Sequence, residues 1–214
     1  MEFFSFFMER KAEITQLTLE HAMLSAIAVT LATIIGVPLG ILLTRARKVA
    51  TLVLAFANII QTIPSLALLG LIMVLPCVGG IGARPAIAAL FLYSLLAIIR
   101  NTHVGISQVN SVLTEVGKGM GMTSWQLLTL VELPQALPFI MAGIRISTVI
   151  CIGTTTIASA IGAGGLGQYI FRGIYRNHNM MVLWGALPAA ALALLADWGL
   201  GKIEKTLKKG AESV

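Results

Sequence analysis

The sequence has few charged residues, few aromatic residues and only two cysteines. Charged residues make up 11% of its 214 residues, whereas a water-soluble domain carries roughly 25% because water must wet its surface. This shortage of charge excludes an ordinary soluble domain. Hydrophobic residues make up 57% of the chain, and its mean hydropathy is +0.90. Most of the surface must therefore face the lipid bilayer.

The residue types that support catalysis or metal binding are scarce and scattered. Cys77 and Cys151 lie in or beside apolar stretches without metal-ligand spacing, and we interpret them as small hydrophobic residues. His21, His103 and His178 have no partner at the spacing of a metal site or of a nucleophile with its base. We therefore expect no catalytic residue, no metal site and no enzymatic activity in this chain.

The basic balance of the chain does not indicate a nucleic-acid partner. The net charge is +6 and the pI is about 9.7. However, the cations stand at the ends of apolar runs and form no basic stripe with interleaved aromatic residues. Such a pattern is typical of charges that set the orientation of a protein beside anionic lipid.

Long apolar runs predict an all-α, polytopic membrane protein. A helix of about 20 apolar residues crosses a bilayer, and in hydrocarbon it pairs its backbone groups internally. The apolar start of the chain lacks a basic region and a cleavage site, so we do not interpret it as a signal peptide. We predict a single transmembrane domain over residues 1–214, with about five spans at approximately 22–43, 49–75, 85–104, 137–160 and 180–200.

The basic residues predict the orientation. With five spans the two ends of the chain lie on opposite sides of the membrane. Five cations fall on the side of the N-terminus: Arg10, Lys11, Arg84, Arg172 and Arg176. Ten fall on the other side: Arg45, Arg47, Lys48, Arg100, Lys118, Arg145, Lys202, Lys205, Lys208 and Lys209. Positive charge resists translocation, so we predict an external N-terminus, a cytoplasmic C-terminus, a cytoplasmic loop at about 105–134 and an external loop at about 162–179.

The cytoplasmic loop contains two predicted short helices. Glu115 is expected near the N-terminus of a helix, where it opposes the macrodipole. Gly121 permits a left-handed residue or a close backbone approach between the two helices. Thr123 or Ser124 is a candidate N-cap for a second helix over Trp125–Val131, which Pro134 would end. Because this second helix carries apolar residues in a loop, it suits docking into a groove on another protein or lying on the membrane surface.

The spacing of this loop resembles the EAA motif of ABC-importer permeases. Glu115, Gly121, Leu133 and Pro134 match the motif, and Val131 replaces its isoleucine. Val116 and Gly117 depart from its double alanine. The resemblance favours the docking helix and implies that a separate ATPase binds here. The residues expected to couple to the ATPase are Glu115, Gly121, Thr123, Trp125, Leu133 and Pro134.

A second glycine motif has no role in nucleotide binding. Gly162, Gly164 and Gly167 match a dinucleotide fingerprint, but a membrane helix precedes them and no acidic residue follows at the required distance. We predict that this run ends the fourth span and turns the chain. The sequence also lacks a phosphate-binding loop, so a partner subunit must bind any ATP and Mg²⁺, and we expect no cofactor in this chain.

Polar residues inside the spans are candidates for a translocation path. Asn58, Gln61 and Pro64 lie in the second predicted span, and Pro64 weakens the helix locally. Thr154 and Thr155 lie in the fourth, where hydrogen bonds to the carbonyls of their own helix are the more frequent role. Elsewhere, Gly36 and Gly40 form a face that suits helix packing, and Arg145 and Asp197 are expected to pair or snorkel near the cytoplasmic side.

From about Ile27 to Asp197 the chain resembles the permeases of osmoprotectant importers, which carry glycine betaine, choline, carnitine or related quaternary amines. The resemblance lies in NIIQTIPSLALLG, ALFLYSLLAIIRNTHVGI, EVGKGMGM and TTTIASAIGAGGLG. It implies a type I importer fold in the bacterial cytoplasmic membrane, a second permease subunit, two ATPases and an external binding protein. Three alternatives remain: a permease for an amino acid such as methionine, an ion-coupled carrier, and an intramembrane enzyme.

Overall fold

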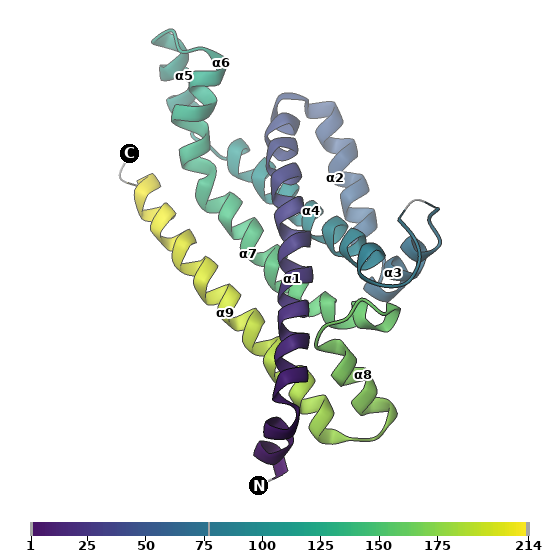
Figure 1. Cartoon of the computed structure of the whole chain (residues 1–214). Coiled ribbons are helices and arrows are strands. Elements are labelled where there is room, and N and C mark those ends of the chain that lie inside the picture. Colours follow the sequence, from purple (N-terminus) through teal and green to yellow (C-terminus); the bar gives the residue numbers. More distant parts are fainter. Residues whose placement is uncertain (1, 77, 213–214) are drawn as a thin grey trace.

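The computed structural model describes residues 2–76 and 78–212, so Cys77 lies outside the described residues. Helices make up all the regular structure in this part of the chain (Figure 1). They are α1 (Glu2–Arg45), α2 (Arg47–Thr62), α3 (Ser65–Met73), α4 (Ala83–Ser107), α5 (Ser111–Gly119), α6 (Ser124–Leu127), a π-helical turn (Leu128–Glu132), α7 (Leu133–Ala158), a 3₁₀ turn (Ser159–Ile161), α8 (Gly167–Tyr175) and α9 (Asn179–Glu212).

The prediction of an all-α membrane protein with about five spans is confirmed. Four helical segments are long and apolar enough to cross a membrane, and the bent pair α2 and α3 makes up to five. The outer helices are longer than predicted, because α1 already begins at Glu2 and α9 continues to Glu212. The two predicted loops are also partly helical: 105–134 contains α5 and α6, and 162–179 contains α8.

The second predicted span, 49–75, is wrong as a single helix. The chain bends by 101° between α2 and α3. Proline has no backbone N–H and disfavours helical geometry in the residue before it. Accordingly, Ile63 is extended and Pro64 precedes the first residue of α3. The Tyr93 hydroxyl of α4 donates a hydrogen bond to the carbonyl of Ile63 and so binds the break to the bundle.

Small residues allow the central helices to approach closely. A Cβ atom at Gly40 in α1 would lie 2.6 Å from Cβ of Thr102 in α4. A Cβ atom at Gly143 in α7 would likewise lie 2.6 Å from Cβ of Asn101 in α4. The helix-packing role predicted for Gly36 and Gly40 is thereby confirmed, since Gly36 lies against Ile98.

An ion-pair cluster joins α7 to α9. Arg145 donates to both carboxylate oxygens of Asp197, at 2.7 and 2.9 Å, and to Glu204 at 3.2 Å. The predicted pairing of Arg145 with Asp197 is confirmed, and it gives a charged side chain inside an apolar helix the partner that it requires.

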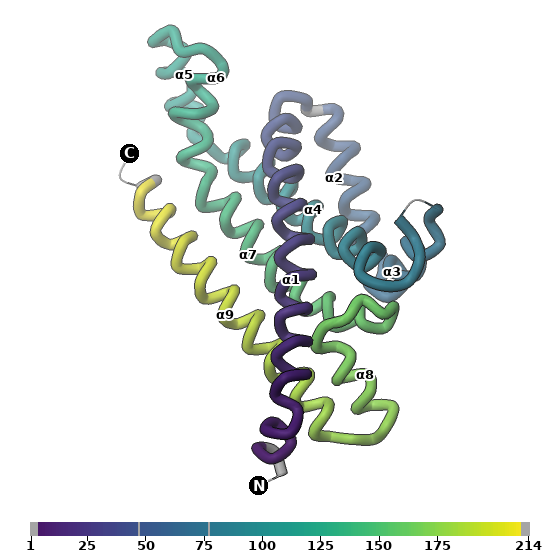
Figure 2. The backbone as a smooth tube through the Cα atoms, viewed as in Figure 1, coloured from purple at the N-terminus to yellow at the C-terminus, as the bar shows by residue number. Residues whose placement is uncertain are grey.

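The two ends of the molecule carry different features. The N-terminus and α8 lie at one end, whereas the α1–α2 connection, α5, α6 and the C-terminus lie at the other (Figures 1 and 2). Near the first end, Tyr169 donates to Glu13 at 2.6 Å, and burial together with this bond raises the pKa of Tyr169. Gly162 and Gly164, with φ of +77° and +94°, turn the chain after α7 as predicted.

Candidate functional site

A protruding unit of two short helices lies at the second end of the bundle (Figure 1). We call it the α5–α6 unit, residues 111–127. Asn110 caps α5 by accepting a hydrogen bond from the Val112 N–H at 2.9 Å. The helix ends at Gly119, and Gly121, just beyond its C-cap Met120, has a left-handed φ of +82° as predicted. The N–H groups of Gly121 and Met122 bond to the carbonyls of Lys118 and Gly117, which is the Schellman arrangement for glycine after a helix.

Thr123 begins the second helix through a capping box. Its hydroxyl accepts from the Gln126 N–H at 3.3 Å, and the Gln126 side chain accepts from the Thr123 N–H at 2.8 Å. Of the two predicted caps, Thr123 and Ser124, the structure selects Thr123. The two local motifs fix the angle between α5 and α6, because each satisfies backbone groups that a helix end leaves unpaired.

Two predictions about this unit are wrong. Glu115 does not lie near a helix N-terminus, because Asn110 starts α5 and places Glu115 in its second turn, exposed. Pro134 does not end the helix over Trp125–Val131 either. Helical structure runs without interruption from Ser124 to Ile161, and Pro134 lies in the first turn of α7. Pro134 stands just after the π-helical turn Leu128–Glu132, where the i→i−4 bonding of an α-helix is already interrupted, and this is where a proline without an N–H is accommodated.

The base of the unit contains a buried ion pair that sequence reasoning missed. The π-helical turn Leu128–Glu132 precedes α7, and such turns occur frequently at functional sites. The Glu132 side chain is 6% exposed, and its ion-pair partner is Arg45 in the last turn of α1, which is 50% exposed. Val37 and Ile41 of α1 and Leu128 of the turn also pack against the same buried cluster. The base of the α5–α6 unit is therefore attached to the end of α1.

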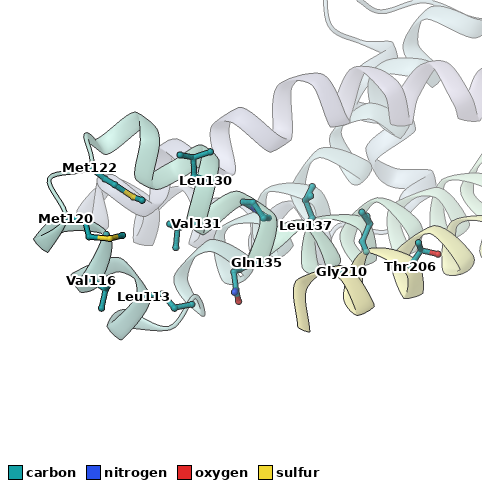
Figure 3. A pocket seen from close by; sticks show the side chains of 13 residues that line it. Leu113, Val116, Met120, Met122, Leu130, Val131, Gln135, Leu137, Thr206 and Gly210 are labelled. Carbon is teal, nitrogen blue, oxygen red and sulfur yellow. The ribbon is translucent and has the colours of Figure 1, made fainter. Parts of the chain in front are cut away.

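The α5–α6 unit presents apolar side chains to its surroundings. Trp125 and Met120 are 72% and 67% exposed, and Leu130 in the π-helical turn that follows is 62% exposed. Beside them lies a groove of about 360 Å³ between the unit, the start of α7 and the end of α9 (Figure 3). Its lining is almost wholly apolar and consists of Leu113, Val116, Gly117, Met120, Met122, Leu130, Val131, Pro134, Gln135, Leu137, Thr206, Leu207 and Gly210.

The structure brings the predicted coupling residues together at one end of the molecule. Glu115, Gly121, Thr123 and Trp125 are exposed on the α5–α6 unit. Leu133 and Pro134 are half-buried at its base. This arrangement presents exposed apolar side chains on two capped helices. Among the described residues, no group of three or more His, Cys, Asp or Glu lies close enough to hold a metal ion.

The predicted path residues are more dispersed. Asn58 and Gln61 are exposed on α2, and Pro64 lies at the break between α2 and α3. Thr154 is half-buried and donates to the Ile150 carbonyl at 2.9 Å. Thr155 is fully buried; it donates to the Cys151 carbonyl at 2.7 Å and lies 2.9 Å from the Ser25 hydroxyl. Thr155 thereby joins α7 to α1, and the path role of the five residues stays a prediction.

Comparison with known proteins is consistent with this geometry. Residues 33–209 match the family model described as binding-protein-dependent transport system inner membrane component. The chain is 47% identical to the glycine betaine/carnitine/choline transport system permease protein OpuCB of Bacillus subtilis, over 98% of this chain and 96% of that one. It is 46% identical to the osmoprotectant import permease protein OsmW of Salmonella typhimurium, over 97% of each chain.

The fold is also that of a solved transporter. An inward-facing structure of the MetNI methionine ABC transporter contains a chain that superposes with a TM-score of 0.83. The identity is 24%, and the match covers 91% of this chain and 95% of that one. This likeness shows the fold alone. Taken with the family match, it identifies the chain as a multi-pass protein of the bacterial cytoplasmic membrane that belongs to the inner membrane components of binding-protein-dependent transport systems.

Proposed function

We propose that this chain is the permease subunit of an ATP-driven importer for small osmoprotectants such as glycine betaine, choline and carnitine. The observation that carries the proposal is the exposed, apolar α5–α6 unit at the end of the bundle that also holds the C-terminus (Figure 1). The solute class is supported by identities of 46–49% to permeases named for these compounds.

The α5–α6 unit is the docking surface for an ATPase subunit in this proposal. A short helix with exposed apolar residues suits insertion into a groove of another protein. Trp125 has the large, amphipathic side chain that dominates many interfaces. Because Glu132 at the base of the unit pairs with Arg45 of α1, a displacement of the unit is transmitted to the first span as well as to α7.

The complete transporter requires further subunits. A second permease, identical or related, completes the translocation path, and two cytoplasmic ATPases bind ATP with Mg²⁺. An external binding protein captures the solute and delivers it to the outer end, where the N-terminus and α8 lie. ATP-driven closure of the ATPases then moves the two α5–α6 units and alternates access to the path between the two sides.

Gly121 provides the sharpest test of ATPase docking. Its φ of +82° strains any side chain, although no atom lies within 4 Å of the position where a Cβ would stand. We expect Gly121→Asp to leave membrane insertion unchanged and to lower co-purification of the ATPase at least about tenfold. A side chain in left-handed geometry costs about 1–2 kcal/mol, and relief of this strain would change the angle between α5 and α6. Co-purification of tagged permease with its ATPase measures this effect.

Gly119 is the matched control. It lies two residues earlier, also has open space around its Cβ position, and has no positive φ. Gly119→Asp should therefore retain ATPase binding. Equal ATPase binding by both variants and the unmodified chain would contradict the proposed docking surface.

A further inference from the structure

A small cavity lies where α2, α4 and α7 meet. It has a volume of about 280 Å³ and is lined by Gln61, Tyr93, Ala97, Ser147 and Ile150. This volume is close to the lower end of small-molecule sites, which span roughly 300–1,000 Å³. None of these five lining residues is charged, and Tyr93 is the aromatic residue among them.

We propose that this cavity is a transient site for the quaternary ammonium group of the solute, with the ring of Tyr93 as its principal contact. The inference rests on the proposed function, since it assumes a quaternary amine as the solute. Such a group has no N–H and cannot donate a hydrogen bond, so hydroxyl and amide acceptors hold it poorly. An aromatic face attracts it through the ring quadrupole.

The absence of a carboxylate among the lining residues suits a site of passage. Conduction requires binding that is favourable enough for entry but weak enough for release. A cation–π contact contributes about 0.5–2 kcal/mol, which lowers the barrier without trapping the solute. A carboxylate in the same apolar surroundings would bind the cation far more strongly.

Hydrogen bonds hold the cavity wall in place. The Tyr93 hydroxyl donates to the Ile63 carbonyl at the break before Pro64, so the ring on α4 is attached to the broken span. Ser147 of α7 donates at 3.1 Å to the carbonyl of Ser94, the residue after Tyr93. The ring therefore keeps its orientation before a solute arrives, which reduces the ordering that binding requires.

The cavity also adjoins two of the polar residues predicted for the path. Gln61 lines it directly and is exposed. Thr154 lies one helical turn beyond Ile150 on α7 and is half-buried. Uncharged polar side chains at the edge of the cavity, beside the aromatic ring, suit a solute that has a hydroxyl or carboxylate group as well as a quaternary ammonium group.

Two substitutions at Tyr93 distinguish the contribution of the ring from that of the hydroxyl. Tyr93→Phe removes the bond to Ile63 and keeps the ring, whereas Tyr93→Leu removes both. In proteoliposomes with the complete transporter, we expect Tyr93→Phe to retain choline uptake within about threefold. Tyr93→Leu should lower the maximal rate about 5- to 30-fold, which corresponds to about 1–2 kcal/mol at 1.4 kcal/mol per tenfold change. Affinity for the loaded binding protein should not change in either variant.

A series of fluorinated phenylalanines at position 93 tests the cation–π contact itself. Fluorine withdraws electron density from the ring face and hardly changes its shape, so each variant should fold like Tyr93→Phe. The logarithm of the uptake rate should fall steadily with the number of fluorines. A flat series, or equal losses in Tyr93→Phe and Tyr93→Leu, would overturn this inference alone. Failure of the unmodified transporter to carry any quaternary amine would instead overturn the proposed function.

Discussion

At the residue scale, the ion pair between Arg45 and Glu132 predicts an asymmetry between two substitutions. The Glu132 side chain is buried, whereas that of Arg45 is half exposed. Arg45→Met leaves a buried carboxylate without its counterion, and such a loss costs about 3–5 kcal/mol in fully buried pairs. Glu132→Gln leaves a guanidinium that still reaches water. We expect Arg45→Met to lower the melting temperature in detergent more than Glu132→Gln does.

The double variant is the control for this prediction. Arg45→Met combined with Glu132→Gln removes both charges, so the melting temperature should recover most of the loss seen in Arg45→Met. A thermal-shift measurement on the purified permease compares all three. An equal loss in the two single variants, with no recovery in the double variant, would mean that the pair does not join α1 to the base of the α5–α6 unit.

Residues whose role depends only on neighbours a few positions away in the chain could be predicted from the sequence. Gly121 and Thr123 follow local rules of helix ends, and the structure has both as expected. The buried pair could not be predicted in the same way, because Arg45 lies 87 positions before Glu132. A carboxylate within the apolar run before Pro134 was the available signal, but its partner depends on how α1 packs.

At the element scale, the close contact between α1 and α4 depends on Gly40. A Cβ there would lie 2.6 Å from Cβ of Thr102 and 3.0 Å from the Ile99 carbonyl oxygen. We expect Gly40→Ala to destabilise the permease by about 1–3 kcal/mol, because two helix backbones must move apart. Gly153→Ala in α7 is the matched control, since no atom lies within 4 Å of its Cβ position.

The control substitution should be neutral or stabilising by roughly 0.5–1 kcal/mol, because alanine favours a helix over glycine. Chemical or thermal unfolding in detergent, followed by circular dichroism, measures both variants. Similar stabilities for Gly40→Ala and Gly153→Ala would show that α1 and α4 tolerate a wider separation than the structure has.

Hydropathy predicts where helices lie, but not where they break. Pro38, Pro138 and Pro188 all lie inside helices, whereas Pro64 separates α2 from α3 by a bend of 101°. Pro64 has polar neighbours on both sides, Thr62 and Ser65, whereas the nearest neighbours of the other three are apolar. Tertiary contacts also stabilise the break: Tyr93 donates a hydrogen bond to the Ile63 carbonyl, and Leu69 of α3 and Ala86 of α4 share one buried cluster.

At the scale of the whole molecule, many large apolar side chains are exposed on the bundle. Leu19, Leu31 and Leu42 are exposed along α1, whereas Leu52, Phe56 and Leu66 are exposed on α2 and α3. In the proposed transporter, the surface that meets lipid and the surface that meets a second permease would both be apolar, so composition does not distinguish them. The same limit explains why the sequence predicted membrane helices and a coupling loop more readily than the residues that contact the solute.

The most direct test of the account is the initial rate of solute uptake into proteoliposomes that contain this permease, its ATPase and its binding protein. We expect ATP-dependent uptake of radiolabelled glycine betaine, choline or carnitine, and loss of that uptake when the ATPase is omitted or when Gly121→Asp replaces the unmodified chain. Uptake of methionine in place of these compounds would contradict the proposed solute. Full uptake without the ATPase would contradict the proposed importer.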